Sequence, residues 1–259
     1  MAVLAGDYYA ECHELFRHAT NQQRLMLAEI RPRYQGAASL SILSVGAGVG
    51  LFEMPMLDLL FGQGVNITKF VGNDFDSYAC KVLRQKLENK YRDDFVYEVV
   101  AVPFEDFFSK DRFDLILFNH VFEYIPGNHL KLLKKAQWLL ADGGHILLFS
   151  PSKPGINKIY AETFHHLHGY SPVFAGEIGE ILIKGDIPFK KKKIMGECDI
   201  SLFKEAMKFH EKLMLLSFLT QIDCRRIPLE KQNEYLEYYL SLRFPGKDTI
   251  PHPATMFII

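Results

Sequence analysis

The 259-residue sequence lacks several features that mark particular classes of protein. Its four cysteines are far apart and form no CxxC or other metal-ligand spacing, so neither a disulfide framework nor a cysteine metal site is indicated. Basic and acidic side chains nearly balance at a net charge of −1, which gives no long-range field for nucleic acid or an anionic membrane. No apolar run approaches a membrane span, and the first residues lack the basic start of a signal peptide. We therefore expect a cytoplasmic protein that binds neither nucleic acid nor a membrane.

The most informative motif is a set of three glycines on alternate positions. The apolar run 41–45 ends in Gly46, Gly48 and Gly50, and a helix-like segment follows over 51–61. A strand that enters a helix through such a turn brings backbone close to a ligand without interference from Cβ atoms. The third glycine comes one residue earlier than in the G-x-G-x-x-G fingerprint of dinucleotide-binding proteins. By themselves the glycines leave open a plain tight turn between a strand and a helix.

Strands that alternate with helices predict the fold. Apolar runs at 40–45, 69–74, 95–102, 113–119 and 145–149 read as strands, and helical patterns occupy 51–60, 77–87 and 130–140. This order is typical of an α/β, doubly wound, mostly parallel sheet.

The remaining segments predict additions to this core. Residues 7–30 form a helix that Asp7 caps and that ends before Pro32, and 151–170 form a connection. A helix over 177–183 and a strand over 189–195 follow, and then two helices over 202–219 and 230–242 precede a last strand over 255–259. We expect a single domain, with an N-terminal helical cap (1–38), a core (39–150) and a C-terminal part (151–259) that holds helices and a final hairpin.

Four pieces of this pattern resemble class I S-adenosylmethionine-dependent methyltransferases. They are the glycine loop at 45–50, the strand over 71–74 that ends in Asp74, the strand Phe113–Asn119, and the segment 139–145 with its Asp-Gly-Gly turn. The resemblance covers about residues 40–150. It implies a Rossmann-like sheet of seven strands with an antiparallel hairpin at the end. It also implies S-adenosylmethionine as the cofactor and S-adenosylhomocysteine as the product.

A closer resemblance covers most of the chain. The segments 16–20, 42–46, 155–158 and 198–201, together with the terminal strand, are similar to the histamine N-methyltransferase branch of this superfamily.

The resemblance assigns cofactor-binding roles. The three glycines pack against the amino acid part and ribose of the cofactor, and Asp74 accepts hydrogen bonds from both ribose hydroxyls. Glu105 meets the adenine, with Asp106 as the neighbouring alternative, and the backbone at Asn119 lies near the sulfonium. Phe75 and Phe104 are candidates to sandwich the adenine, and ordinary core aromatics are the alternative reading.

Residues after Asn119 face the acceptor, because ligands of parallel sheets sit at the carboxyl ends of strands. These residues are His120, Glu123 and Tyr124. The resemblance places four more side chains at acceptor-contacting positions, which are Tyr8, Asn21, Tyr160 and His252.

The chain departs from the histamine enzymes at three of these positions. Those enzymes carry glutamate, glutamine and asparagine where this chain has Asn21, His120 and His252. We therefore expect a small acceptor other than histamine, an amine or an imidazole-type nitrogen, with His120 or His252 as the catalytic proton acceptor. For each histidine, a structural role is the alternative.

Other functions are open at this stage. One alternative is a methyltransferase that acts on nucleic acid or protein, but residues 119–122 do not form the Asn-Pro-Pro-Tyr type of motif and the sequence has no basic patch. Another is a non-catalytic relative, against which the intact glycines and Asp74 speak. His165, His166 and His168 have no carboxylate or cysteine pattern beside them, so we expect no metal. We expect a monomer.

Overall fold

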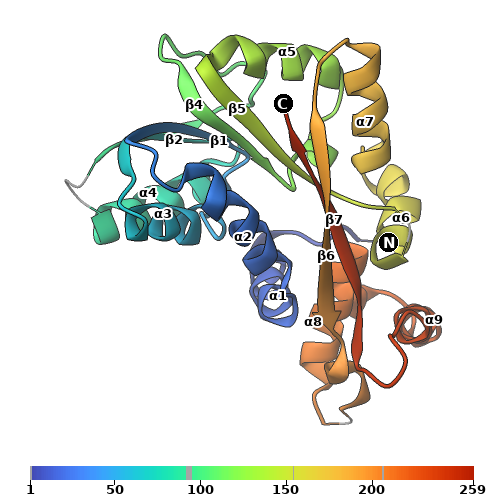
Figure 1. Ribbon diagram of the computed structural model, residues 1–259. Coiled ribbons are helices and arrows are strands. Elements are labelled where there is room, and N and C mark those ends of the chain that lie inside the picture. The colour runs from blue at the N-terminus through green and yellow to red at the C-terminus, as the bar shows by residue number, and fades with distance from the viewer. Residues whose placement is uncertain (1, 92–94, 154, 206) are drawn as a thin grey trace. The chain divides into compact units, whose positions relative to one another are not determined.

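The computed structural model describes residues 2–91, 95–153, 155–205 and 207–259. Its seven-stranded sheet has the order β3-β2-β1-β4-β5-β7-β6 (Figure 1). The strands are β1 (Ser39–Val45), β2 (Asn66–Asp74), β3 (Val96–Ala101), β4 (Phe113–Asn119), β5 (Leu140–Pro151), β6 (Lys190–Asp199) and β7 (Thr249–Ile258).

The first five strands pair in parallel. Three helices connect successive parallel strands: α3 (Glu53–Gly62), α4 (Ser77–Tyr91) and α5 (His129–Leu139). The central strands β1 and β4 are almost wholly buried, as strands covered on both faces must be. The expected doubly wound α/β fold is confirmed.

The order of the strands reverses between β1 and β4, and this point positions the site. From β1 the chain proceeds outward to β2 and β3, then returns to β4 on the other side of β1. In doubly wound sheets, ligands bind in the crevice outside the carboxyl ends of the strands at such a switch point. Here the carboxyl ends of β1 and β4 lead into the glycine loop and the His120 segment.

The last strand runs against the others. The backbone groups of Ile146 in β5 and Ile259 exchange hydrogen bonds of 2.8 and 3.0 Å in both directions, which is the signature of an antiparallel pair. β7 thus lies between β5 and β6, and the expected antiparallel ending of the sheet is confirmed.

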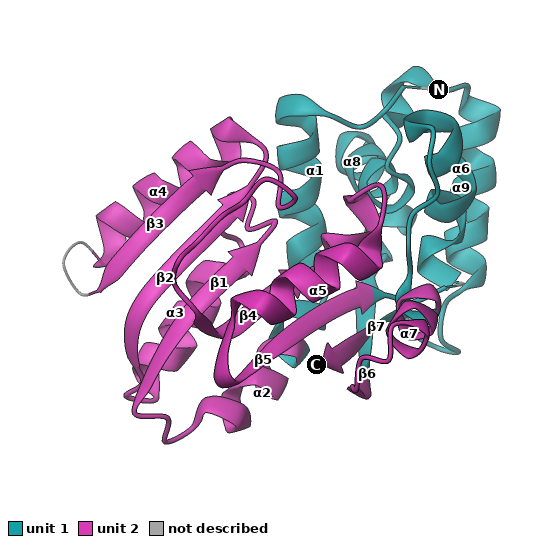
Figure 2. Cartoon of the chain, turned by 90° about the horizontal axis from the view of Figure 1, so that it is seen from above, with its two compact units in different colours: residues 1–25, 151–176, 193–254 teal, residues 26–150, 177–192, 255–259 magenta. Residues whose placement is uncertain are grey.

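The chain divides into two compact units, coloured teal and magenta in Figure 2. Unit 2 holds residues 26–150, 177–192 and 255–259, which include β1–β5 and the helix α7 (Ala175–Lys184) from Glu177 onward. Unit 1 holds residues 1–25, 151–176 and 193–254. Its helices are α1 (Gly6–Ala19), α6 (Lys158–His168), α8 (Phe209–Thr220) and α9 (Leu229–Ser241).

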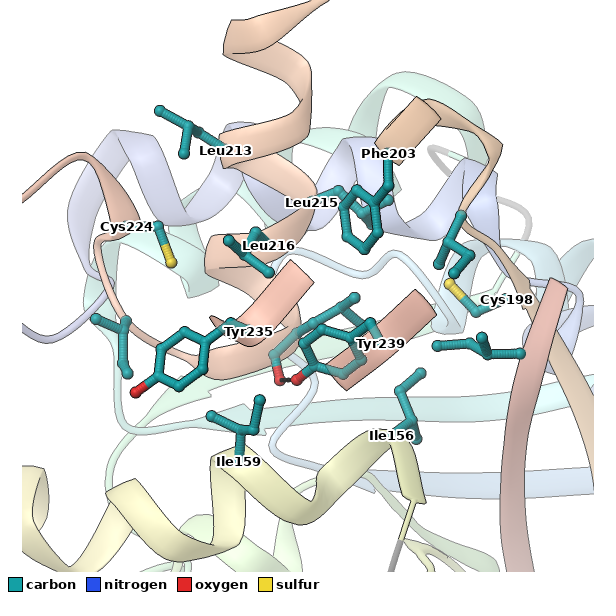
Figure 3. Packing of buried hydrophobic residues seen from close by; sticks show 14 of the residues in the cluster. Ile156, Ile159, Cys198, Phe203, Leu213, Leu215, Leu216, Cys224, Tyr235 and Tyr239 are labelled. Carbon is teal, nitrogen blue, oxygen red and sulfur yellow. Dashed lines mark hydrogen bonds between the residues drawn. The ribbon is translucent and has the colours of Figure 1, made fainter. Parts of the chain in front are cut away.

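Unit 1 has its own hydrophobic core, in which α8 and α9 pack with the aliphatic face of α6 (Figure 3). Leu216 and Tyr239 lie at its centre, fully buried, and the Tyr239 hydroxyl donates a hydrogen bond of 3.0 Å to the carbonyl of Leu219. A buried phenol needs such a partner, since an unpaired hydroxyl would lose its hydration without compensation.

The single helix expected over 7–30 is wrong. The structure has α1, a break at Thr20–Asn21, and then α2 (Gln22–Tyr34). Thr20 forms an antiparallel bridge with Cys198, and the amide of Asn21 donates to the carbonyl of Glu197. The amide of Thr20 still closes α1 on the carbonyl of Phe16, whereas the amide of Asn21 leaves the helical series because it pairs with β6. Pro32 lies inside the second helix.

Three other expected details differ. The N-cap of α1 is Ala5, and Asp7 lies in the first turn, so Asp7 is not the cap. The expected connection over 151–170 contains α6. The helix expected over 202–219 consists of a short 3-10 turn, Ser201–Lys204, followed by α8, with residue 206 outside the described part.

Among the residues that the structure describes, no helix combines the length and the apolar character needed to cross a bilayer.

We expect Leu216→Ala to lower the free energy of unfolding by about 2–5 kcal/mol, because it leaves a cavity in the centre of the unit 1 core. Leu216 is fully buried, whereas Leu229 at the start of α9 is 61% exposed. Leu229→Ala is the matched control and should change stability by less than about 0.5 kcal/mol. Denaturant unfolding of the two variants measures the difference, and equal losses would contradict this account of the core.

Candidate functional site

The glycine loop joins β1 to α3, and its backbone takes a conformation that favours glycine. Gly46, Gly48 and Gly50 have φ values of +66°, +53° and +78°. A Cβ atom on Gly46 would lie 2.1 Å from a methyl group of Val121, and one on Gly50 would lie 2.6 Å from Leu83. These two glycines are therefore required by close packing as well as by φ.

Gly48 differs from its two neighbours. A Cβ there would meet nothing within 4 Å, so the space beside this backbone is open. Its amide donates a hydrogen bond of 2.8 Å to the Oδ2 atom of Asp74, at the end of β2. The other carboxylate oxygen of Asp74 accepts from the amide of Asp76 at 2.9 Å. The loop is thus an open cradle of backbone with a carboxylate fixed at its side.

The expected adenine-binding residues lie in different environments. Phe75 follows Asp74 directly and is 77% exposed, so its ring is accessible to a ligand. Phe104 is buried and packs against Phe107 and Phe118, which makes it part of the core. Glu105 is exposed, and its backbone carbonyl accepts from the ammonium group of Lys135 at 2.7 Å. Lys135 also donates to the carbonyl of Phe104 and so fixes this turn.

Sequence reasoning missed a buried carboxyl group beneath the loop. Glu53, in the first turn of α3, is almost fully buried and accepts a hydrogen bond of 2.8 Å from the hydroxyl of Ser44 in β1. Burial is the main cause that raises the pKa of Glu53 to about 7. Hydrogen bonds from Ser44 and from the backbone of Phe52 and Glu53 oppose the rise, and the negative charge of Asp74 adds a smaller increase. The sequence signal is weak, because Glu53 is one of two acidic residues on this helix and the other, Asp58, pairs with Lys90.

The end of β4 carries a second group of polar side chains. The Oδ1 atom of Asn119 is buried and has no hydrogen-bond partner among the described residues. His120 follows with φ of +50°, and its amide donates to the carbonyl of Phe149. Glu123 is buried in the short turn Phe122–Tyr124, and Tyr124 is partly exposed. The structure brings this group to the glycine loop, because Val121 is the residue that fills the space at Gly46.

The other expected acceptor-contacting residues belong to unit 1. His252 is buried, with its Nδ1 atom 2.7 Å from the hydroxyl of Thr20 and its ring edge-on to Phe16. The side-chain carbonyl of Asn21 accepts from the amide of Glu197 at 2.8 Å and so supports the break between α1 and α2.

The two tyrosines of unit 1 lie in separate surroundings. The ring of Tyr160 packs edge-on against Phe164 and Phe174. The ring of Tyr8 lies under the guanidinium of Arg225, with 3.4 Å between the guanidinium carbon and the ring centroid. His165, His166 and His168 lie in the last turn of α6, in the same unit.

Comparison with known proteins identifies one matching family. Residues 16–178 match the model of a methyltransferase domain family, which is more than half of the chain. No curated protein sequence matches.

Solved structures share the fold at low sequence identity. The YcgJ protein of Bacillus subtilis has a TM-score of 0.59 at 13% identity, with 90% of this chain and 96% of that one covered. Coclaurine N-methyltransferase, bound to N-methylheliamine and S-adenosylhomocysteine, has a TM-score of 0.54 at 10% identity, with 92% and 72% covered. The plantazolicin methyltransferase BpumL, in complex with a triazolic substrate analogue and S-adenosylhomocysteine, has a TM-score of 0.51 at 16% identity, with 92% and 84% covered.

The raised pKa of Glu53 predicts how stability depends on pH. Between about pH 4.5 and 7 the folded chain keeps a proton that the unfolded chain releases, so the Glu53 contribution to stability is lost as pH rises through this window. Glu53→Gln removes this loss. The free energy of unfolding of the variant, relative to the unmodified protein, should therefore increase by about 3 kcal/mol between pH 4 and pH 8. Denaturant unfolding at the two pH values checks this, and a difference that does not change with pH would exclude a buried, titrating Glu53.

Proposed function

This chain belongs to the methyltransferase domain family, and we propose on that premise that it transfers the methyl group of S-adenosylmethionine to a nitrogen of a small molecule, an amine or an imidazole. The observation that carries the proposal is the open backbone cradle at Gly48, with Asp74 fixed beside it. At the end of β4, the Oδ1 atom of Asn119 has no hydrogen-bond partner within the described part of the chain.

The residues of unit 2 fit this cofactor. The open space at Gly48 would let the amino acid part and the ribose of the cofactor lie close to the backbone. Gly46 and Gly50 would form the rest of this loop. Asp74 offers a carboxylate to the ribose hydroxyls, and the exposed ring of Phe75 offers a face to the adenine. Glu105 and Asn119 complete the set that would hold the cofactor.

Methyl transfer from a sulfonium to a nitrogen requires no covalent bond between the protein and the reactants. The cofactor supplies a methyl group on a positively charged sulfur. The residues of the chain hold the acceptor nitrogen in line with that group and take up its proton. In unit 2, His120 is a candidate proton acceptor and Tyr124 a candidate acceptor contact. In unit 1, His252 is the other candidate proton acceptor, and the candidate acceptor contacts are Tyr8, Asn21 and Tyr160.

The residues that differ from the histamine N-methyltransferase branch favour a different acceptor. Asn21, His120 and His252 replace a glutamate, a glutamine and an asparagine, so a carboxylate is absent from the start of α2. We therefore propose an acceptor other than histamine, although the resemblance to that branch stays a prediction. Coclaurine N-methyltransferase, a structural neighbour, is itself an N-methyltransferase of a small molecule, which is consistent with this class.

We expect Asp74→Ala to weaken S-adenosylhomocysteine binding by about tenfold to a hundredfold, because hydrogen bonds to a charged group are lost. Isothermal titration calorimetry measures the affinity. Asp76→Ala is the matched control: its carboxylate accepts from the amides of Tyr78 and Ala79 and caps α4, so its loss should lower stability and leave affinity unchanged. Equal affinities for the two variants would count against the ribose role of Asp74.

A methyl-transfer screen tests the whole proposal. The screen uses labelled S-adenosylmethionine and compares imidazoles, primary amines, thiols and phenols as acceptors. Asp74→Ala, measured at a low cofactor concentration, serves as the control with reduced transfer. We expect transfer to nitrogen compounds. A silent small-molecule panel alongside transfer to RNA or peptide would favour a macromolecular substrate. A chain that does not bind S-adenosylhomocysteine would be a non-catalytic relative.

A further inference from the structure

The backbone at His120 is held in an unfavourable conformation. Its φ of +50° lies in the left-handed region, which residues with a side chain adopt only rarely. Glycine would occupy this position without a steric cost. The amide of His120 is fixed to the carbonyl of Phe149, so the strain is maintained by the pairing of β4 with β5. This conformation, at the carboxyl end of a central strand, makes His120 a candidate for a functional role.

Glu123 lies three residues later and faces that imidazole. Its Oε1 atom is 3.7 Å from Nδ1 of His120, and its side chain is only 3% exposed. The other oxygen, Oε2, is buried and has no hydrogen-bond partner among the described residues. A buried carboxylate without full compensation is costly, and an amide or an apolar side chain of the same shape would serve packing better.

The exposure of the two side chains shows how this carboxylate can act. An acceptor molecule cannot reach a carboxylate that is 3% exposed, whereas the imidazole of His120 is 28% exposed. Among the described residues, His120 is thus a group through which the negative charge of Glu123 can act on a ligand. At a separation of 3.7 Å in a buried setting, the charge favours a proton on the nitrogen that faces it.

We propose that Glu123 is a positioning residue that holds the proton of His120 on Nδ1, so that Nε2 is presented as the proton acceptor for the methylated nitrogen. This inference rests on the proposed function for the identity of the reaction, but the tautomer that it assigns is a property of the chain alone. It changes the part expected of Glu123 from a wall of the acceptor pocket to a support for the base.

The neighbouring residue places this pair beside the glycine loop. Val121, between His120 and Glu123, packs on Gly46 so closely that a Cβ atom there would lie 2.1 Å from its methyl group. His120 is thus one residue from a direct contact with the loop that would hold the cofactor.

The proton balance of the step is complete. The lone pair of the acceptor nitrogen forms the new bond to the methyl carbon, and the carbon–sulfur bond breaks with its electron pair moving to the sulfur. The acceptor nitrogen then carries one positive charge and one surplus proton. That proton passes to Nε2 of His120, whose positive charge is balanced by the buried carboxylate of Glu123.

Nitrogen NMR of the histidine rings tests the assignment without any acceptor. The full chain is labelled with ¹⁵N-histidine and measured at a pH of about 9, where an ordinary imidazole is neutral. The chain has ten histidines, and His120→Asn identifies the His120 signals by their loss. We expect His120 to carry its proton on Nδ1, against the preference of a free imidazole for Nε2. In Glu123→Gln that preference should weaken or reverse.

Two controls separate positioning from a packing role. Glu88→Gln removes an exposed carboxylate on α4 of the same unit and should leave the His120 signals unchanged. Glu123→Gln should bind S-adenosylhomocysteine as the unmodified protein does, with a melting temperature that is equal or higher, because a buried charge is removed.

Three results would overturn the proposal. They are a proton on Nε2 of His120 in the unmodified protein, unchanged His120 signals in Glu123→Gln, or a large fall in melting temperature in that variant with the tautomer intact. The spectrum of the unmodified protein decides the point if the variant does not fold. Failure of S-adenosylhomocysteine to bind would instead contradict the proposed function and leave the tautomer result standing.

Discussion

The close approach of Val121 to Gly46 is the constraint on which the candidate site depends. It locks the turn after β1 to the turn after β4, across the two strands where the sheet reverses its order. Neither turn can be moved without the other, because the side chain of one fills the space that the missing side chain of the other leaves open. The open cradle at Gly48 and the strained backbone of His120 lie on either side of this contact.

The sequence was most informative where local pattern and fold coincide. The sequence predicts all five parallel strands, because buried strands between helices form unbroken apolar runs. Their ends agree to within three residues except at β5, which begins at Leu140 where the end of a helix and a glycine turn are expected. The break at Thr20–Asn21 was missed, since it depends on hydrogen bonds to residues 197 and 198 that no local pattern reveals. The sequence also predicts a connection where the structure has α6. The helical pattern of this segment is short, and the helix is stabilised by packing in unit 1.

The sequence predicts the cofactor loop of the candidate site better than it predicts the burial of the side chains around that loop. The family match over residues 16–178 confirms the expected S-adenosylmethionine-dependent methyltransferase, and the spacing of the glycines and Asp74 was sufficient to anticipate it. The position of Glu53 in the sequence of α3 does not predict its burial. Its side chain is buried because it contacts Ser44 in the neighbouring strand β1, and that contact depends on the fold. Nor could the sequence distinguish Phe75 from Phe104, one exposed and the other in the core.

The position of β7 has a consequence for the edges of the sheet. This strand follows β6 in the chain, yet it lies between β5 and β6 in the sheet. Because β7 is the neighbour that β5 and β6 share, a substitution that disrupts β7 would leave an edge of β5 unpaired and would separate β6 from the rest of the sheet. Unpaired strand edges are templates for pairing with other chains, so an intact β7 protects the protein from edge-to-edge association.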